Sequence, residues 1–260
     1  MGACERNSRL CAFQLEEYKN GYSIVTVSLL DNGSTLYGGD SLSVEKTSFI
    51  GSHTSALPLE VLSYSFVDFV FINEGVYALW NLLKIIRINP VALSKVNGIG
   101  YRDFDSVKLT NPEVVVPQDR LDIDLPGYAW DLLPFKEKPF DLYRSPMWHA
   151  EYDFNNRTPY AAIQTSLGCQ FQCEFCMINI INRSDNESIG VAGNYNQMRF
   201  WSTDFIIKEF DKLIQMGVRT IRIVDEMFLL NPKYYIPLCE QLAERNKNDD
   251  LRMWAYSRID

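Results

Sequence analysis

The sequence predicts an α/β protein, because segments typical of strands alternate with segments typical of helices along most of its 260 residues. Residues 23–29 are β-branched and apolar, as a buried strand requires. Residues 76–88 carry leucine and isoleucine at helical spacing. Residues 203–216 repeat that spacing between a serine and a glycine, which commonly flank helices. Alternation at these lengths favours parallel sheets.

The front of the chain, residues 1–90, is expected to form one such sheet of the Rossmann type. Its predicted strands are 23–29, 47–50 and 66–72, and its predicted helices are 57–62 and 76–88. Pro58 falls in the first helical turn, where a missing backbone N–H leaves no hydrogen bond unmade.

Residues 91–158 are predicted to be a linker with short hairpin elements. Residues 98–102 and 107–109 are the candidate strands of one hairpin. Proline interrupts the rest of this stretch at positions 112, 117, 126, 134, 139 and 146.

Regular alternation resumes in residues 159–260. Ser202 or Thr203 can cap the helix that precedes Gly217, and Asn231 with Pro232 begins a second helix that runs to about Arg245. The predicted strands of this part are 161–165, 218–224 and 253–256.

Charge and hydropathy argue against a nucleic-acid-binding, a secreted or a membrane-spanning protein. A formal net charge of −8 disfavours nucleic-acid binding, which usually needs a basic face. Residues 1–10 contain no apolar run of secretory length, and charged residues interrupt the apolar stretch 66–88. We expect a soluble, cytoplasmic protein. Arg219 and Arg222, beside a predicted strand, are expected to lie at a solvated edge of the sheet.

Three of the six cysteines, Cys169, Cys173 and Cys176, fall within eight residues. This clustering favours a metal site in a reducing compartment over a disulfide framework. Thiolates suit iron–sulfur chemistry, and a [4Fe–4S] cluster needs four ligands for full ligation. Cys239 lies far along the chain in a predicted helix. One iron would therefore stay open to a substrate or cofactor.

Other interpretations of these cysteines fit less well. Structural zinc needs a closed set of four ligands, and the two histidines, His53 and His149, do not supply a suitable pattern. Unligated core cysteines at this spacing are equally disfavoured. A closed electron-transfer cluster lacks its fourth cysteine.

The Cys-x-x-x-Cys-x-x-Cys pattern after a strand, with Phe175 before the last cysteine, resembles the signature of radical S-adenosylmethionine (SAM) enzymes. The resemblance implies a [4Fe–4S] cluster whose open iron binds SAM. One electron then cleaves SAM reductively to methionine and a 5′-deoxyadenosyl radical, which abstracts hydrogen from the substrate. It also implies a small-molecule or biosynthetic-intermediate substrate and a reductant such as flavodoxin or ferredoxin.

The same resemblance suggests the residues around SAM. Phe175 would lie near the adenine. Asp225 and Glu226, at the end of a predicted strand, would lie at the SAM amino group, or else cap the following turn. Arg258 would pair with a carboxylate, or else be an ordinary surface arginine.

The front half resembles radical SAM proteins that carry an N-terminal cobalamin-binding-like domain. Residues 50–58 are similar to a Gly-Gly-x-His-x-Thr-x-x-Pro stretch, residues 66–75 to the strand and Gly-Glu-Gly turn that follow it, and residues 125–134 to a Leu-Pro…Trp-Asp-Leu-Leu-Pro linker. Ile50, Ser55 and Asn73 depart from these patterns. The Asp-x-His-x-x-Gly loop that supplies a cobalamin ligand is missing, so the sequence favours His53 as a turn histidine over a ligand. Cobalamin binding stays open as the less favoured alternative.

The expected fold is therefore an incomplete Rossmann-like domain followed by part of a radical SAM (β/α) barrel. Few residues follow Cys176 for a family barrel of about six strands, so the chain is expected to be truncated, or else to need a partner that completes the barrel. Two functions remain open. The first is a radical SAM enzyme, such as a methyltransferase or another enzyme that modifies a carbon centre. The second is a catalytically silent, truncated cluster-binding protein.

Overall fold

A computed structural model describes ten segments of the chain, which divides into two compact units. The first unit contains residues 1–116 and 171–195, and the second contains residues 117–170 and 196–260. The described segments are 10–18, 22–29, 44–88, 90–104, 106–132, 159–171, 173–176, 178, 197–248 and 250–257.

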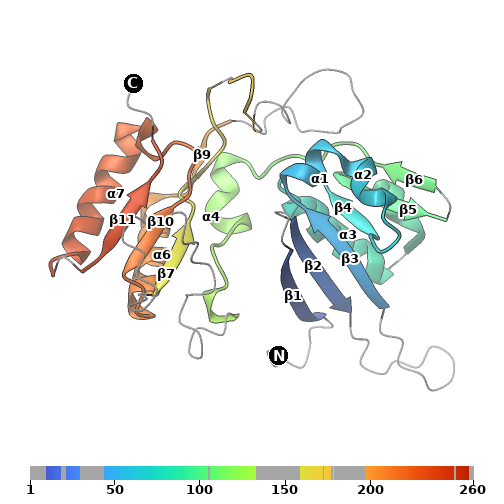
Figure 1. Ribbon diagram of the computed structural model, residues 1–260, viewed down its shortest axis with the longest axis horizontal. Helices are drawn as coiled ribbons and strands as arrows, with labels where there is room; N and C mark the ends of the chain where they lie inside the picture. Colours follow the sequence, from blue (N-terminus) through green and yellow to red (C-terminus); the bar gives the residue numbers. More distant parts are fainter. Residues whose placement is uncertain are drawn as a thin grey trace. The chain divides into compact units, whose positions relative to one another are not determined.

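The first unit is built on a six-stranded sheet whose strands lie side by side in chain order (Figure 1). One neighbouring pair of these strands, β3–β4, is parallel, and the other pairs are antiparallel. The strands are β1 (Leu10–Tyr18), β2 (Tyr22–Leu29), β3 (Val44–Ile50), β4 (Phe69–Phe71), β5 (Ile99–Asp103) and β6 (Ser106–Leu109).

This sheet corrects the prediction that the strands of the front half are parallel, since β3–β4 is the one parallel pair among its described strands. Tyr18 pairs with Tyr22, so β1 and β2 form a hairpin, and a hairpin forces antiparallel strands. The strand pair β3–β4 has a helical crossover, which is what a parallel pair needs. β1 itself was not predicted.

Short helices connect the strands of the first unit. Helix α1 (Ser52–Ala56) was not predicted, whereas α2 (Pro58–Ser63) begins with proline at its first turn as expected. Helix α3 (Val76–Ile88) has the predicted bounds, and the 3₁₀ turn η1 (Pro90–Lys95) follows it.

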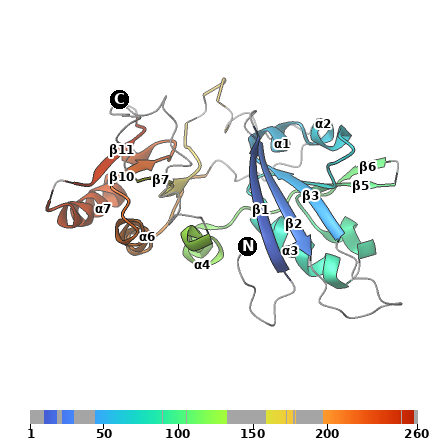
Figure 2. The same cartoon turned by 60° about the horizontal axis from the view of Figure 1, so that its bottom comes forward.

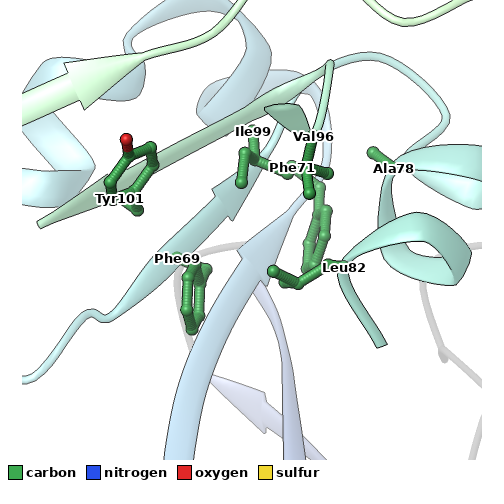
Figure 3. Packing of buried hydrophobic residues seen from close by; sticks show 7 residues of the cluster. All are labelled: Phe69, Phe71, Ala78, Leu82, Val96, Ile99 and Tyr101. Atoms are coloured by element: carbon green, nitrogen blue, oxygen red, sulfur yellow. The ribbon is translucent and has the colours of Figure 1, made fainter. Parts of the chain in front are cut away.

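Strand β4 is buried on both faces. Phe69 and Phe71 pack with α3 and β5 in one cluster of buried side chains (Figure 3), and Val70 packs with α2 residues in another. Alternate residues of a strand face opposite sides of the sheet, so this division follows from the sequence order. The cluster in Figure 3 contains Phe69, Phe71, Ala78, Leu82, Val96, Ile99 and Tyr101.

The hairpin predicted inside the linker is confirmed as β5–β6, and it belongs to the first sheet because β5 pairs with β4. Gly100 lies at this junction under close-packed side chains. A Cβ there would lie 2.6–2.7 Å from the side chains of Leu62, Val70 and Leu109.

The second unit holds a parallel sheet of three described strands in the order β7–β10–β11. These are β7 (Tyr160–Ile163), β10 (Thr220–Ile223) and β11 (Arg252–Ala255). Helix α6 (Thr203–Gln215) precedes β10 and α7 (Pro232–Arg245) precedes β11. Figure 2 shows both helices on one side of the strands. The α/β class is confirmed.

The predicted helix ends of this unit are confirmed. The Ser202 side chain accepts a hydrogen bond from the backbone N–H of Phe205 at 3.1 Å and caps α6. The Asn231 side chain accepts one from the N–H of Lys233 at 3.2 Å and caps α7. Gly217, after α6, has φ +90°, which favours glycine.

Residues 117–132, which we call the strap, were predicted as linker but are hydrogen-bonded to the second unit. They contain η2 (Gln118–Arg120), α4 (Leu121–Asp124) and η3 (Trp130–Leu132). The Gln118 side chain exchanges two hydrogen bonds with the backbone of Phe200, at 2.7 and 2.8 Å. The Trp201 indole donates to the carbonyl of Leu125 at 2.9 Å. These contacts make the strap part of the second unit.

Candidate functional site

The three clustered cysteines lie in a loop that follows the short strand β8 (Ser166–Leu167), which pairs with β9 (Arg199–Phe200). Gly168 has φ +85°, a left-handed conformation that glycine adopts without strain, and it turns the chain out of β8. Cys169 is buried, and Cys173 and Cys176 are half-buried.

The cysteine loop, residues 168–176, has the right donors for an iron–sulfur cluster. All three thiols are free of disulfides, and the N–H of Cys176 donates to the carbonyl of Cys173 at 2.9 Å, which closes a turn between them. Cysteine thiolates are the usual ligands of iron–sulfur clusters. Within the described residues, no three His, Cys, Asp or Glu side chains are gathered as a preformed metal site.

Asp225 lies just past β10, at the edge of the sheet where β7 also ends, because the two strands are parallel. Its side chain is 1% exposed and accepts three hydrogen bonds. Oδ1 accepts from the N–H of Thr165 at 2.6 Å, and Oδ2 accepts from the hydroxyls of Thr165 at 2.5 Å and Ser166 at 2.7 Å. Burial raises the pKa of Asp225, and these hydrogen bonds oppose the rise.

Two tyrosines complete the contacts at this edge. The Tyr234 hydroxyl, from α7, donates to the carbonyl of Thr165 at 2.9 Å. The Tyr128 hydroxyl, from the strap, accepts from the N–H of Gln164 at 2.8 Å. Burial raises the pKa of Tyr128 to about 12 and also raises the pKa of Tyr234. Both phenols are therefore neutral hydrogen-bonding groups at physiological pH.

The other predicted SAM residues differ from Asp225 in exposure. The Phe175 side chain is 88% exposed, and Glu226 is exposed next to buried Asp225. Partial desolvation, and then the neighbouring Asp225, raise the pKa of Glu226. Arg258 lies outside the described residues.

The two arginines at β10, Arg222 within the strand and Arg219 just before it, make more contacts than the solvated edge that we expected. The Arg222 guanidinium lies 4.8 Å from the Trp254 ring centre and 5.0 Å from that of Tyr256. It also donates to the Tyr256 hydroxyl at 2.7 Å. Arg219 pairs with Asp250 at 3.0 Å. The sequence did not reveal that Arg222 packs on aromatic rings, because Trp254 and Tyr256 come from β11 and the residues just after it, about 30 positions along the chain.

The motif segments of the front half contact one another. The Ser55 hydroxyl accepts a hydrogen bond from the N–H of Asn73 at 2.9 Å, and Asn73 has φ +63°. His53 lies in α1, with Nε2 3.5 Å from a Glu60 carboxylate oxygen. His149 lies outside the described residues.

No family model matches this sequence. The chain is 25% identical over 211 residues to an uncharacterized methyltransferase of Pyrococcus horikoshii. It is 23% identical over 220 residues to the anaerobic magnesium-protoporphyrin IX monomethyl ester cyclase of Cereibacter sphaeroides. Each alignment covers 80% of this chain. A 93-residue stretch, 35% of the chain, is 31% identical to the hopanoid C-2 methylase of Rhodopseudomonas palustris.

All three relatives are named as enzymes, so the chain is related to enzymes, as the sequence predicted. The chain spans 39%, 30% and 15% of their respective lengths. None of the helices in the described part of the chain is long and apolar enough to cross a membrane.

Proposed function

We propose that this chain carries the cluster and SAM site of a radical SAM enzyme. The observation that supports this most directly is the position of three free thiols, Cys169, Cys173 and Cys176. They lie in the loop reached from the carboxyl end of β7, the first strand of a three-stranded parallel sheet. Binding loops at the carboxyl ends of parallel strands are the usual place for catalytic groups in α/β folds.

In this proposal the three thiolates hold a [4Fe–4S] cluster and leave one iron to SAM. When bound, the pair would supply one-electron reductive chemistry at the SAM sulfonium. Phe175 offers an exposed ring for the adenine, and Glu226 offers an exposed carboxylate for the SAM amino group. Arg258 is proposed to pair with a carboxylate.

We further propose that β7, α6, β10, α7 and β11 form the first part of a (β/α) barrel within residues 159–260. The parallel β3–β4 pair with its helical crossover is the feature that supports a proposed Rossmann-like part, related to cobalamin-binding domains, in residues 1–90. We do not assign cobalamin to it, because the sequence lacks the Asp-x-His-x-x-Gly loop.

The relatives' names support the proposed reaction class. Two are named for methyl transfer or methylation and one for a cyclisation. We propose that a small molecule is modified at a carbon centre, with electrons from a flavodoxin- or ferredoxin-type reductant in the cytoplasm.

Anaerobic reconstitution of the chain with iron and sulfide tests the proposal. We expect about four irons per chain, as a [4Fe–4S] cluster requires. Addition of dithionite and SAM is then expected to yield 5′-deoxyadenosine and methionine, measured by mass spectrometry. A cluster without SAM cleavage would support the alternative of a catalytically silent cluster-binding protein. Failure to retain iron after reconstitution would exclude both.

A further inference from the structure

Thr165 and Ser166 form the connection between β7 and the cysteine loop, with Ser166 opening β8. Both are buried, at 0% and 3% exposure. The N–H and hydroxyl of Thr165 both donate to Asp225. Its carbonyl accepts from the Tyr234 hydroxyl and from the N–H of Trp201, at 2.9 and 3.2 Å. The N–H, the carbonyl and the hydroxyl of Thr165 therefore all take part in hydrogen bonds.

The Asp225 carboxylate is directed at this connection and at 1% exposure has almost no contact with solvent. Oδ1 and Oδ2 both accept hydrogen bonds from Thr165 or Ser166. At this exposure the carboxylate is turned toward the protein interior rather than toward a cofactor bound at the surface of the loop.

We propose that Asp225 is a positioning residue, whose buried carboxylate fixes Thr165 and Ser166 and thereby the direction in which Cys169 leaves β8. The cofactor-facing carboxylate of the acidic pair is then Glu226. The functional meaning of this inference rests on the proposed cluster site, but the geometry itself can be tested without iron.

The site needs a carboxylate in particular. One N–H and two hydroxyls point at it, and an ionised carboxylate is an acceptor at both oxygens. Asparagine keeps one acceptor, and the hydroxyls can rotate to accept from its amide. Alanine leaves all three donors without their partner. We therefore expect the effect of Asp225→Asn to lie between those of the wild type and Asp225→Ala.

The control variant is Asp211→Asn. Asp211 on α6 pairs with Arg245 on α7 through two hydrogen bonds of 2.6 and 2.9 Å. It belongs to the same unit, and its carboxylate contacts Arg245 of α7 rather than any described residue of β7, β8 or the cysteine loop. If faster labelling came only from a general loss of folding stability, Asp211→Asn would label faster as well.

The first measurement is the rate of iodoacetamide labelling of Cys169 in the metal-free protein, followed by peptide mass spectrometry. Buried Cys169 reacts when the local structure opens, so we expect labelling about tenfold faster in Asp225→Asn and faster still in Asp225→Ala. Asp211→Asn is expected to label like the wild type. Equal Cys169 rates in Asp225→Asn and the wild type would overturn the positioning role.

The second measurement is the electron paramagnetic resonance spectrum of the reduced, reconstituted protein. We expect Asp225→Asn to retain iron but to show a smaller SAM-induced spectral change, whereas Asp211→Asn matches the wild type. Glu226→Gln is expected to lower SAM affinity without changing Cys169 labelling. A labelling difference in a protein that binds no iron would support the positioning geometry and contradict the proposed function, so the two failures are distinguishable.

Discussion

The carboxylate of Glu209, on α6, accepts a hydrogen bond from the indole nitrogen of Trp130 at 3.2 Å, although the two residues are 79 positions apart. Glu209 is 1% exposed, and it also accepts from the N–H of Tyr128 at 3.4 Å and pairs with Lys212. A buried carboxylate is stable in a protein when its hydrogen bonds are satisfied. Trp130 therefore holds the strap against α6.

Trp130→Phe keeps an aromatic ring but removes the indole donor. We expect the free energy of unfolding to fall by about 1–3 kcal/mol, since Glu209 loses a partner while it stays buried. Urea unfolding followed by circular dichroism measures the change. Trp80→Phe is the matched control, because Trp80 is 58% exposed on α3. Equal effects of the two substitutions would contradict the role of the Trp130–Glu209 bond.

Gly127→Ala tests how closely the strap approaches α6. Gly127 has φ +91°, and a Cβ there would lie 2.8 Å from the Glu209 carboxyl carbon. Gly217→Ala is the control, because Gly217 has φ +90° with nothing within 4 Å of a Cβ. We expect the control to lose about 1 kcal/mol from backbone strain and Gly127→Ala to lose distinctly more. Similar losses in thermal unfolding would show that steric contact with Glu209 is unimportant.

Asp225 is expected to make the free energy of unfolding depend on pH in the acid range. Its folded pKa is raised above the ordinary 3.8 by burial, so the native state holds the proton more tightly than the unfolded state does. Its contribution to stability is thus fully present below pH 3.8 and is lost as the pH rises through the folded pKa. Titratable neighbours are Glu226, Tyr128 and Tyr234.

The measurement is urea unfolding of the wild type and Asp225→Asn between about pH 3 and 7. We expect the stability of the wild type relative to the variant to decrease with rising pH. An increase over that range would mean that the folded pKa is lowered rather than raised.

Iron retention is expected to separate the cluster cysteines from Cys239. After reconstitution, Cys173→Ala is expected to lose most of its iron, because the proposed cluster would be left with two protein ligands. Cys239→Ala is expected to keep the wild-type iron content, since Cys239 is on α7, and burial raises its thiol pKa and disfavours the thiolate. Iron and acid-labile sulfide assays measure both. Full iron retention in Cys173→Ala would refute the ligand assignment.

The sequence by itself determined the features that depend on local chemistry. Helix α3 has its predicted bounds, and Ser202, Asn231 and Pro232 begin α6 and α7 as predicted. Capping, proline position and apolar spacing act within a few residues, so they can be recognised without a fold. The cysteine spacing belongs to the same kind of information, and it remains the basis of the proposed cluster.

The tertiary structure decided which segments pair and which polar side chains are buried. A strand's sequence does not state its direction relative to its neighbour, so the antiparallel pairs β1–β2 and β2–β3 of the first sheet were not foreseen. Asp225 satisfies donors 59 and 60 positions away, and Trp130 reaches Glu209 from a stretch predicted as linker. Such contacts depend on the close approach of distant segments, which only the packed chain specifies.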